Sequence, residues 1–289
     1  NTPLEILSLQ NEYWNSVVTY TIEEIKEGRT PNPDMFCNSL IKFGQFYEKI
    51  DASFDKVASG HYAKVIYDDV TKKYQLKQSP DPVKDQTYFL AYLTQQQLSR
   101  AYFPIGDYDK PQIRKMADEF NLPNKNRKDS QGICFLGQVR FNEFVKHHLG
   151  EIQGDIIEAD TNKVLGKHNG YYFYTIGQRS GLKLSGGPWF VVGKDVKQNL
   201  VYVSREDHST REHHKFSSGK LNWISGCKPE ANELDVKIRH GAKKFKCGIY
   251  FDENHELHVN LKTPDSGIAP GQFAVFYDKD LCLGGGVIL

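Results

Sequence analysis

The stretch GRTPNPDMFCNSLIKFG combines a rigid kink, a carboxylate and a thiol. Pro31 and Pro33 bracket Asn32 and favour an extended backbone, because a residue before proline is disfavoured in the helical region. Asp34 and Cys37 follow at once. A carboxylate can move protons and a thiolate can attack an electrophile, so the segment holds the parts of nucleophilic chemistry. A helix-ending turn beside a buried cysteine explains the same residues, and the sequence leaves both interpretations open.

A second cysteine has comparable surroundings. Cys134 lies in RKDSQGICFLG, shortly after Arg127 and Lys128. Positive charge near a thiol lowers its pKa and favours the reactive thiolate. Ile133 and Phe135 flank the cysteine, so packing in a core is the alternative interpretation.

Two further motifs place polar groups at the ends of expected elements. In ASGHY, Gly60 would let the backbone approach a ligand and His61 could hydrogen-bond a base or a phosphate. An ordinary turn is the alternative. In DPVKDQTYFL, Lys84, Asp85 and Gln86 stand at an expected helix start, where a helix N-cap is the alternative.

The histidine spacing does not predict a metal centre. The two HH pairs are neighbours rather than four residues apart, and His255 and His258 lie three apart in an expected strand. The sequence also contains no G-x-x-x-x-G-K-[ST] phosphate loop. We therefore expect no bound metal.

The composition describes an ordered globular protein of two or three domains. The 289 residues are 39% hydrophobic and 12% aromatic, and no run of about 18 apolar residues predicts a membrane span. Five cysteines without a C-x-x-C pair favour a reducing compartment over a secreted disulfide framework. The net charge of +1 means that RNA binding would need local patches. Two patches qualify, with solvated faces as the alternative: Lys125, Arg127 and Lys128, and Lys237, Arg239, His240, Lys243, Lys244 and Lys246.

The first half of the chain has helical periodicity with a few strands. Apolar spacing predicts a helix over 11–27, ended by Gly28, and a second over 40–50. FDKVASGHYAKVIY predicts a strand, a tight turn at Gly60 and another strand. Further helices are expected over 85–101, 111–120 and 141–149.

Short β-rich runs dominate from about residue 150. YYFYTI, PWFVVG and NLVYVS form a first series, and six runs from KLNWI to CLGGGVIL form a second that predicts a small closed barrel or sandwich. We place the domains at 1–149, 150–209 and 210–289.

The motifs are more specific together than singly. TPNPDMFCN with IKF, ASGHY, KDQTYFL, DSQGICFLG, YTIGQRSGL, PWFVVGKD and GQFAVFY follow the order seen in the tRNA-specific 2-thiouridylases, and this resemblance covers nearly the whole chain. It implies an α/β domain of the PP-loop type (adenine nucleotide alpha hydrolase-like), present in part, followed by two small β domains. The last of these would be a β-barrel.

The resemblance implies an enzyme that replaces O2 of the wobble uridine (U34) of certain tRNAs with sulfur, using ATP with Mg²⁺ to adenylate that oxygen. Cys134 would carry a persulfide sulfur delivered by a donor protein. Cys37 would be the nucleophile that attacks the adenylated carbon or releases sulfide from Cys134, and a transient Cys37–Cys134 disulfide would form. Asp34 would act as general acid/base.

By the same resemblance, Gly60 would lie against the nucleotide and a set of residues from both halves of the chain would contact tRNA. That set is Asn32, Pro33, Asp34, His61, Lys84, Asp85, Gln86, Arg239, His240 and Gln272.

The SGGVDSS-type loop with which the family grips ATP pyrophosphate does not occur in this sequence. We expect a fragment, or a chain that has lost its adenylation half and cannot activate uridine alone. A non-catalytic tRNA-binding module is the alternative function. The motifs lean toward the mitochondrial branch of the family, with the bacterial cytoplasm as the alternative, and we expect a monomer that does not contact membranes.

Overall fold

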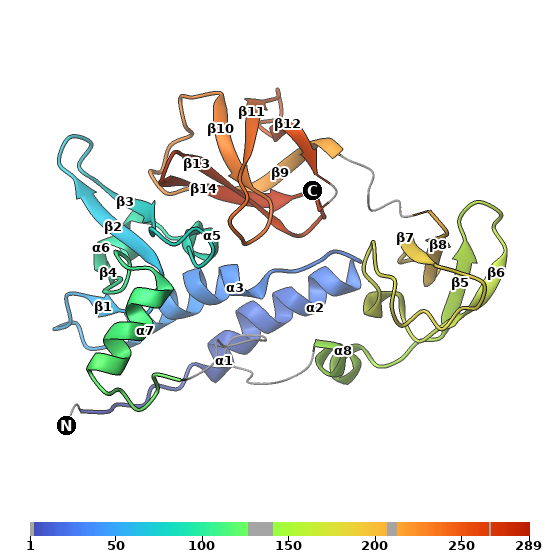
Figure 1. Ribbon diagram of the computed structural model, residues 1–289, viewed down its shortest axis with the longest axis horizontal. Coiled ribbons are helices and arrows are strands. Elements are labelled where there is room, and N and C mark those ends of the chain that lie inside the picture. The colour runs from blue at the N-terminus through green and yellow to red at the C-terminus, as the bar shows by residue number, and fades with distance from the viewer. Residues whose placement is uncertain (1–2, 127–140, 207–212, 266) are drawn as a thin grey trace.

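The computed structural model describes residues 3–126, 141–206, 213–265 and 267–289. Figure 1 shows a helical N-terminal region in blue to green, a small β domain in yellow-green beside it, and a barrel in orange to red above the central helices. The barrel therefore covers helices that come from the first part of the chain.

The first helical run confirms the helix expected over 11–27. Its segments are α1 (Gln10–Tyr13), the wider π-helical η1 (Trp14–Val18) and α2 (Thr19–Lys26). Gly28 ends the run at φ +74°, and a Cβ at this position would meet Val196 Cγ2 at 2.7 Å. Glycine is therefore required both by the backbone and by the packing of the small β domain.

The second helical run begins earlier than the sequence predicts. It consists of α3 (Pro33–Phe36), the π-helical η2 (Cys37–Gln45) and α4 (Phe46–Lys49). Pro33 occupies the first helical position, where its missing N–H loses no helical hydrogen bond. Asp34 and Cys37 therefore lie on this helix, directly after the kink that Pro31 and Pro33 predict.

The strands around Gly60 are confirmed. β1 (Val57–Ala58) pairs in parallel with β4 (Ala101–Tyr102), and β2 (Ala63–Asp68) forms an antiparallel hairpin with β3 (Lys73–Gln78). These elements and the helices make the N-terminal region α/β, as predicted.

The single helix expected over 85–101 is wrong. Two short helices, α5 (Thr87–Leu90) and α6 (Gln95–Arg100), replace it. Thr94 is extended and caps α6 in a reciprocal capping box with Gln97, which ends any continuous helix. The helices α7 (Lys110–Glu119) and α8 (Phe141–Leu149) lie where the sequence predicts them.

The small β domain is a four-stranded sheet in the order β6-β5-β8-β7. Its strands are β5 (Gly154–Glu158), β6 (Val164–His168), β7 (Phe190–Asp195) and β8 (Leu200–Ser204). The strand expected at YYFYTI is wrong, because Tyr171–Phe173 forms the 3-10 helix η3. Tyr171 and Tyr172 are both buried, whereas neighbours in a strand would point to opposite faces.

The C-terminal strands form a closed six-stranded barrel, which confirms that prediction. The order β13-β10-β11-β12-β9-β14 closes through the β13–β14 pairing. The strands are β9 (His213–Trp223), β10 (Glu233–Lys237), β11 (Phe245–Phe251), β12 (Leu257–Asp265), β13 (Phe273–Asp278) and β14 (Leu281–Ile288). β3 also pairs with β14, so the N-terminal hairpin and the barrel share one sheet.

A hydrophobic cluster joins the barrel to α5 and α6. It includes Tyr88, Leu98, Phe273 and Tyr277, all buried. Burial raises the pKa of the Cys247 and Cys282 thiols to about 12, as expected for core cysteines. No helix in the described ranges is long and apolar enough to cross a membrane.

Candidate functional site

Cys37 and Asp34 lie three residues apart on the second helical run, a spacing that brings side chains to one face of a helix. Cys37 is fully buried at the start of η2. Asp34 Oδ1 is also buried and has no hydrogen-bond partner among the described residues. Buried polar atoms are almost always satisfied, so this oxygen and the rare π-helical geometry both mark the segment as unusual.

Asn38 and His61 connect this segment to β1. Asn38 Nδ2 donates to the Asp34 carbonyl at 2.9 Å and to the Phe89 carbonyl at 3.3 Å, so Asn38 Oδ1 is left as an acceptor. It lies 3.1 Å from His61 Nε2, which therefore carries the proton, while His61 Nδ1 accepts from Ser59 Oγ at 2.7 Å. His61 is thus a buried link that positions the η2 helix.

Burial lowers the pKa of His61 to about 3, with a smaller contribution from the positive charge of Lys42. The unfolded chain takes up this proton near the usual value of about 6.5, and the folded chain does so only near 3, so stability falls as the pH drops between them. As the pH is lowered, His61 should decrease the free energy of unfolding by up to about 1.4 kcal/mol per pH unit. The variant His61→Gln should lack this contribution. Urea unfolding between pH 7 and 4 measures it.

The exposed His213 provides the control for that measurement. His213→Gln should keep the wild-type pH dependence. Parallel curves for wild type and His61→Gln would contradict a neutral, buried His61.

Gly60 lies two residues beyond the carboxyl end of β1, which runs parallel to β4. No described atom lies within 4 Å of a Cβ built on Gly60. Ligands of α/β sheets bind outside the carboxyl ends of parallel strands. The open face of Gly60 therefore fits the close approach of a nucleotide.

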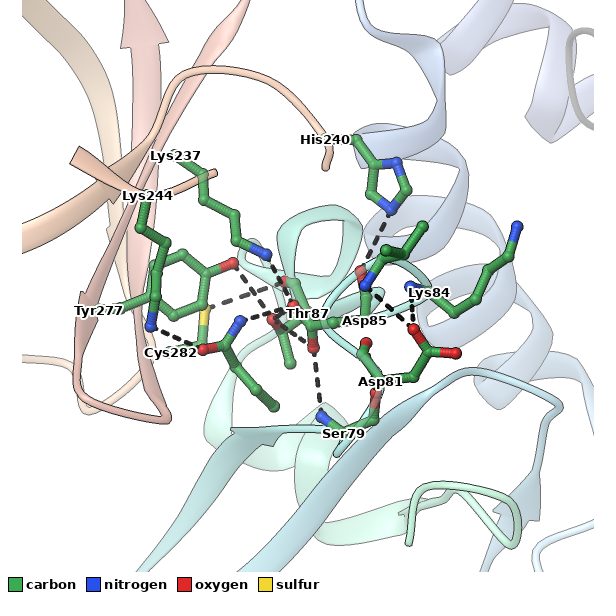
Figure 2. Close-up of polar contacts among 12 residues, drawn as sticks. Ser79, Asp81, Lys84, Asp85, Thr87, Lys237, His240, Lys244, Tyr277 and Cys282 are labelled. Carbon is green, nitrogen blue, oxygen red and sulfur yellow. Dashed lines mark hydrogen bonds and ion pairs between the residues drawn. The ribbon is translucent and has the colours of Figure 1, made fainter. Parts of the chain in front are cut away.

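Asp85 is the centre of a buried polar cluster between the N-terminal region and the barrel (Figure 2). Its carboxylate accepts from Lys237 Nζ at 3.0 Å, with both side chains almost fully buried. It also accepts from Gln78 Nε2 at 2.8 Å and from Thr87 Oγ1 at 2.8 Å. Asp85 is thus a structural hub. Gln86 occupies the N-cap position of α5, as the N-cap alternative allowed, but no side chain among the described residues caps this helix start.

The structure brings several of the predicted RNA contacts together above this hub. His240 Nε2 lies 3.2 Å from the Asp85 carbonyl, and its ring stacks on Phe89 at 4.7 Å. Lys84 and Gln86 flank Asp85, and Gln86 Oε1 accepts from the Tyr62 N–H at 3.0 Å. Figure 2 shows Lys84 and His240 on the same side of the cluster. The Phe89 carbonyl, bonded by Asn38, connects this surface to the helix of Asp34 and Cys37.

Arg239 and Lys237 are placed differently from the basic patch that the sequence predicts. Arg239 forms a two-point ion pair with Asp265, at 2.8 and 3.1 Å. Burial raises the Asp265 pKa, but hydrogen bonds from Arg239, the Gly267 N–H and Lys243 lower it to about 2. The prediction that Lys237 belongs to an exposed basic patch is wrong, because Lys237 is buried against Asp85.

Gln272 contacts the segment that leads into the helical run of Asp34 and Cys37, which we call the reactive helix for the chemistry predicted there. Its Nε2 donates to the Thr30 carbonyl at 2.9 Å and to the Pro31 carbonyl at 3.3 Å. The Asn32 N–H donates to Tyr20 Oη at 3.4 Å, so this segment is held from both sides. No sequence pattern indicates these bonds, because they join parts of the chain more than two hundred residues apart.

Models of three protein families match consecutive parts of the chain. Residues 1–138 match the "tRNA methyl transferase HUP domain", residues 142–205 the "tRNA methyl transferase PRC-barrel domain" and residues 213–288 the "Aminomethyltransferase beta-barrel domain". These models agree with an α/β region followed by two β domains.

Curated relatives align with nearly the whole chain. A Parabacteroides distasonis protein named tRNA-specific 2-thiouridylase MnmA is 48% identical over 292 residues, covering 99% of this chain and 81% of the relative. A Porphyromonas gingivalis MnmA is 45% identical, with 99% and 81% covered, and a Bacteroides thetaiotaomicron MnmA is 46% identical, with 99% and 82% covered. The chain belongs to the tRNA-specific 2-thiouridylase family.

These 2-thiouridylase relatives come from bacteria and do not support the mitochondrial branch that the motifs favoured. The predicted roles of Asp34, Cys37 and Gly60, and the RNA contacts of Asn32 and Pro33, stay predictions for this family member. Cys134, and with it the predicted Cys37–Cys134 disulfide, lies outside the described residues. The four described cysteines form no disulfide with one another.

Among the described residues, one acidic group with a histidine lies on the barrel. Ligand atoms of Asp252, Glu256 and His258 lie within 4.8 Å of one another. Asp252 accepts from His258 Nε2 at 3.2 Å and from the Glu256 N–H at 2.8 Å, which is the bonding of a tight turn after β11. These bonds account for the group without an ion.

Proposed function

We propose that the protein transfers sulfur from a cysteine persulfide to C2 of the wobble uridine, U34, of tRNA, in the cytoplasm of a bacterium. The observation that carries this proposal is the buried carboxylate oxygen of Asp34, which has no hydrogen-bond partner in the described part of the chain and lies one helical turn before the Cys37 thiol. A structural carboxylate would have a partner in the protein. The names of the relatives supply the class of reaction.

In the proposed reaction, Cys134 carries the outer sulfur of a persulfide that a donor protein has loaded. The Cys37 thiolate attacks the Cys134 sulfur, so that a Cys37–Cys134 disulfide forms and hydrosulfide leaves. Hydrosulfide then attacks C2, the C2–O2 bond breaks, and the adenylated oxygen departs as AMP. An external thiol reductant restores both cysteines.

ATP with Mg²⁺ would supply the adenylyl group that turns the uridine oxygen into a leaving group. The open face of Gly60 at the end of parallel strands β1 and β4 fits the nucleotide. Asp34 would accept the proton of the attacking sulfur. Asn32 and Pro33, at the start of the same helix, would contact the unstacked base.

The remaining RNA contacts would come from one continuous surface. Lys84 and His240 lie on the same side of the Asp85 hub, Gln86 follows Asp85 in the chain, and Gln272 lies beside the segment before Asn32. Polar and aromatic groups of this kind read unstacked bases and phosphates. Arg239, partly exposed, would offer its guanidinium to a phosphate while it is held by Asp265.

Because Cys37 is fully buried, the reaction requires the segment to open or shift when RNA binds. The same burial favours the alternative function, a tRNA-binding protein without catalysis. The enzyme would produce thiolated tRNA and the binding protein would not, so a single assay distinguishes the two functions.

The test is thiolation of a tRNA transcript with U34 by the purified protein, ATP, Mg²⁺ and a persulfide donor. Because the SGGVDSS-type ATP-binding loop does not occur in this sequence, a segment that carries such a loop is added to the reaction. With it we expect sulfur-containing RNA, detected by retardation in a mercury-containing gel and by the mass gained when sulfur replaces oxygen, and without it we expect none. A transcript with cytidine at position 34 is the control and should gain nothing. Binding of tRNA without a sulfur product in the reaction that contains this segment would contradict the enzyme, and the mass of an added methyl group would indicate a methyltransferase.

A further inference from the structure

The barrel holds the segment that precedes the reactive helix at a short loop between β12 and β13. Gln272 donates both hydrogens of its amide to backbone carbonyls of that segment, at Thr30 (2.9 Å) and Pro31 (3.3 Å). The Thr30 N–H donates in return to the Pro270 carbonyl at 3.0 Å. Three hydrogen bonds thus join two consecutive residues to the barrel.

The loop fits this segment closely. A Cβ on Gly271 would lie 2.9 Å from Arg29 Cβ and 3.0 Å from the Thr30 carbonyl oxygen, and Gly271 has φ +89°. Only glycine allows such an approach without strain. The segment therefore rests directly on the backbone of the barrel loop.

The loop is itself fixed to the barrel wall. The Gly271 N–H donates to the Ile288 carbonyl at 2.9 Å, and the Ile288 N–H donates to the Gln272 carbonyl at 2.7 Å. Ile288 is fully buried at the end of β14. Movement of the held segment relative to the barrel would therefore break the Gln272 bonds rather than bend the loop.

The held residues lie directly before the helix that carries Asp34 and Cys37. Pro31 and Pro33 restrict the backbone between the loop contact and the helix start. The position of the Pro31 carbonyl therefore constrains the position of Asp34. A second contact lies on the same helix, where the Phe36 and Phe273 rings meet edge to face at 5.7 Å. The barrel thus fixes both the entry and the face of the reactive helix.

We propose that Gln272 is a positioning residue, which holds the Thr30–Pro31 backbone and thereby keeps Cys37 and Asp34 in place on the reactive helix. The importance of this role for catalysis rests on the proposed function of Cys37. Glutamine suits the task, since one amide nitrogen supplies a hydrogen to each carbonyl and Oε1 remains able to accept from RNA. The C-terminal barrel is then part of the catalytic centre as well as an RNA-binding domain.

The test follows the accessibility of Cys37 in the protein without RNA. Gln272→Glu keeps the shape of the side chain but replaces the donating nitrogen with an acceptor that faces two carbonyls. We expect Cys37, fully buried in the wild type, to be alkylated by N-ethylmaleimide about 10-fold faster, the factor that corresponds to the loss of one net hydrogen bond. Peptide mass spectrometry reads Cys37 separately, and the exposed Cys227 serves as internal reference.

A second variant moves the segment without altering the Gln272 side chain. Gly271→Ala places a methyl group against Arg29 and Thr30 and should also accelerate Cys37 alkylation. Gly226→Ala is the matched control, because Gly226 has a similar φ of +80° but open space around its Cβ. It should leave Cys37 as slow as in the wild type.

Two outcomes would overturn the proposal. The first is that Cys37 reacts no faster in Gln272→Glu and Gly271→Ala than in Gly226→Ala. This result would show that the Gln272 and Gly271 contacts do not hold the helix in place. A Gly271→Ala protein with normal turnover but a raised KM for tRNA would assign the loop to RNA binding alone, whereas positioning lowers kcat and leaves this KM near wild type. The alkylation result does not depend on thiolation, so a failure of the proposed function remains distinguishable.

Discussion

Replacing Asp85 by alanine is expected to lower the free energy of unfolding by about 3–5 kcal/mol. The substitution leaves the Lys237 ammonium, 1% exposed, without its carboxylate 3.0 Å away. It also removes the acceptor of Gln78 and Thr87 in the same cluster. An isolated buried charge is costly, and this cost is the largest expected for a single change at the domain interface. Urea unfolding at neutral pH measures it.

The surface pair of Lys262 and Glu233 provides the matched control. Its N–O distance of 2.7 Å is similar, but the side chains are 54% and 74% exposed. Glu233→Ala should cost far less than Asp85→Ala, because water already screens the exposed pair. Asp85→Asn combined with Lys237→Met should be less destabilising than Asp85→Ala, because the amide keeps an acceptor and no buried charge remains. Equal costs for Asp85→Ala and Glu233→Ala would contradict a buried ion pair that joins the domains.

The buried pair of Asp85 and Lys237 could not be predicted from local sequence patterns. Lys237 stands among several basic residues and therefore suggests an exposed patch, and Asp85 stands before a helix and suggests an N-cap. Basic clusters are usually exposed and acidic residues before helices are usually N-caps, so neither pattern indicates a buried ion pair. The partner of each residue lies 152 positions away, and only the packing of the barrel on α5 brings them together.

Local periodicity predicted most elements. The helix ended by Gly28, the strands on either side of Gly60, and the barrel strands all follow from apolar spacing and turn residues. The errors occur where a competing interaction decides. Thr94 caps a new helix, Tyr171 and Tyr172 are buried together, and Pro33 starts a helix instead of ending one.

The candidate site was predictable as a set of motifs but not as a geometry. The resemblance grouped Lys84 and His240 as RNA contacts, and the structure brings both to the same side of Asp85. The sequence left the burial of Cys37 as one of two open interpretations, and it did not predict the inward role of His61, because both depend on helix packing against β1 and the small β domain. The bonds of Gln272 likewise arise only between domains.

The two cysteines proposed for sulfur transfer should fail in different steps when each is replaced by serine. A serine cannot form a persulfide, so Cys134→Ser should take up no sulfur from the donor. Cys37→Ser should load Cys134 normally but lower tRNA thiolation by about 10³-fold or more, because no second thiol releases the sulfur. Persulfide labelling followed by peptide mass spectrometry measures loading, and mercury-gel retardation of tRNA measures transfer.

The exposed Cys227 lies outside the reactive segment and supplies the control, since Cys227→Ser should load and transfer sulfur as the wild type does. Loading of Cys134→Ser at the wild-type level would refute the persulfide assignment. Full thiolation by Cys37→Ser would show that the buried Cys37 is only a core residue, the interpretation that its complete burial also allows. Because loading and transfer are read separately, each cysteine is tested in the one step where its thiol is required.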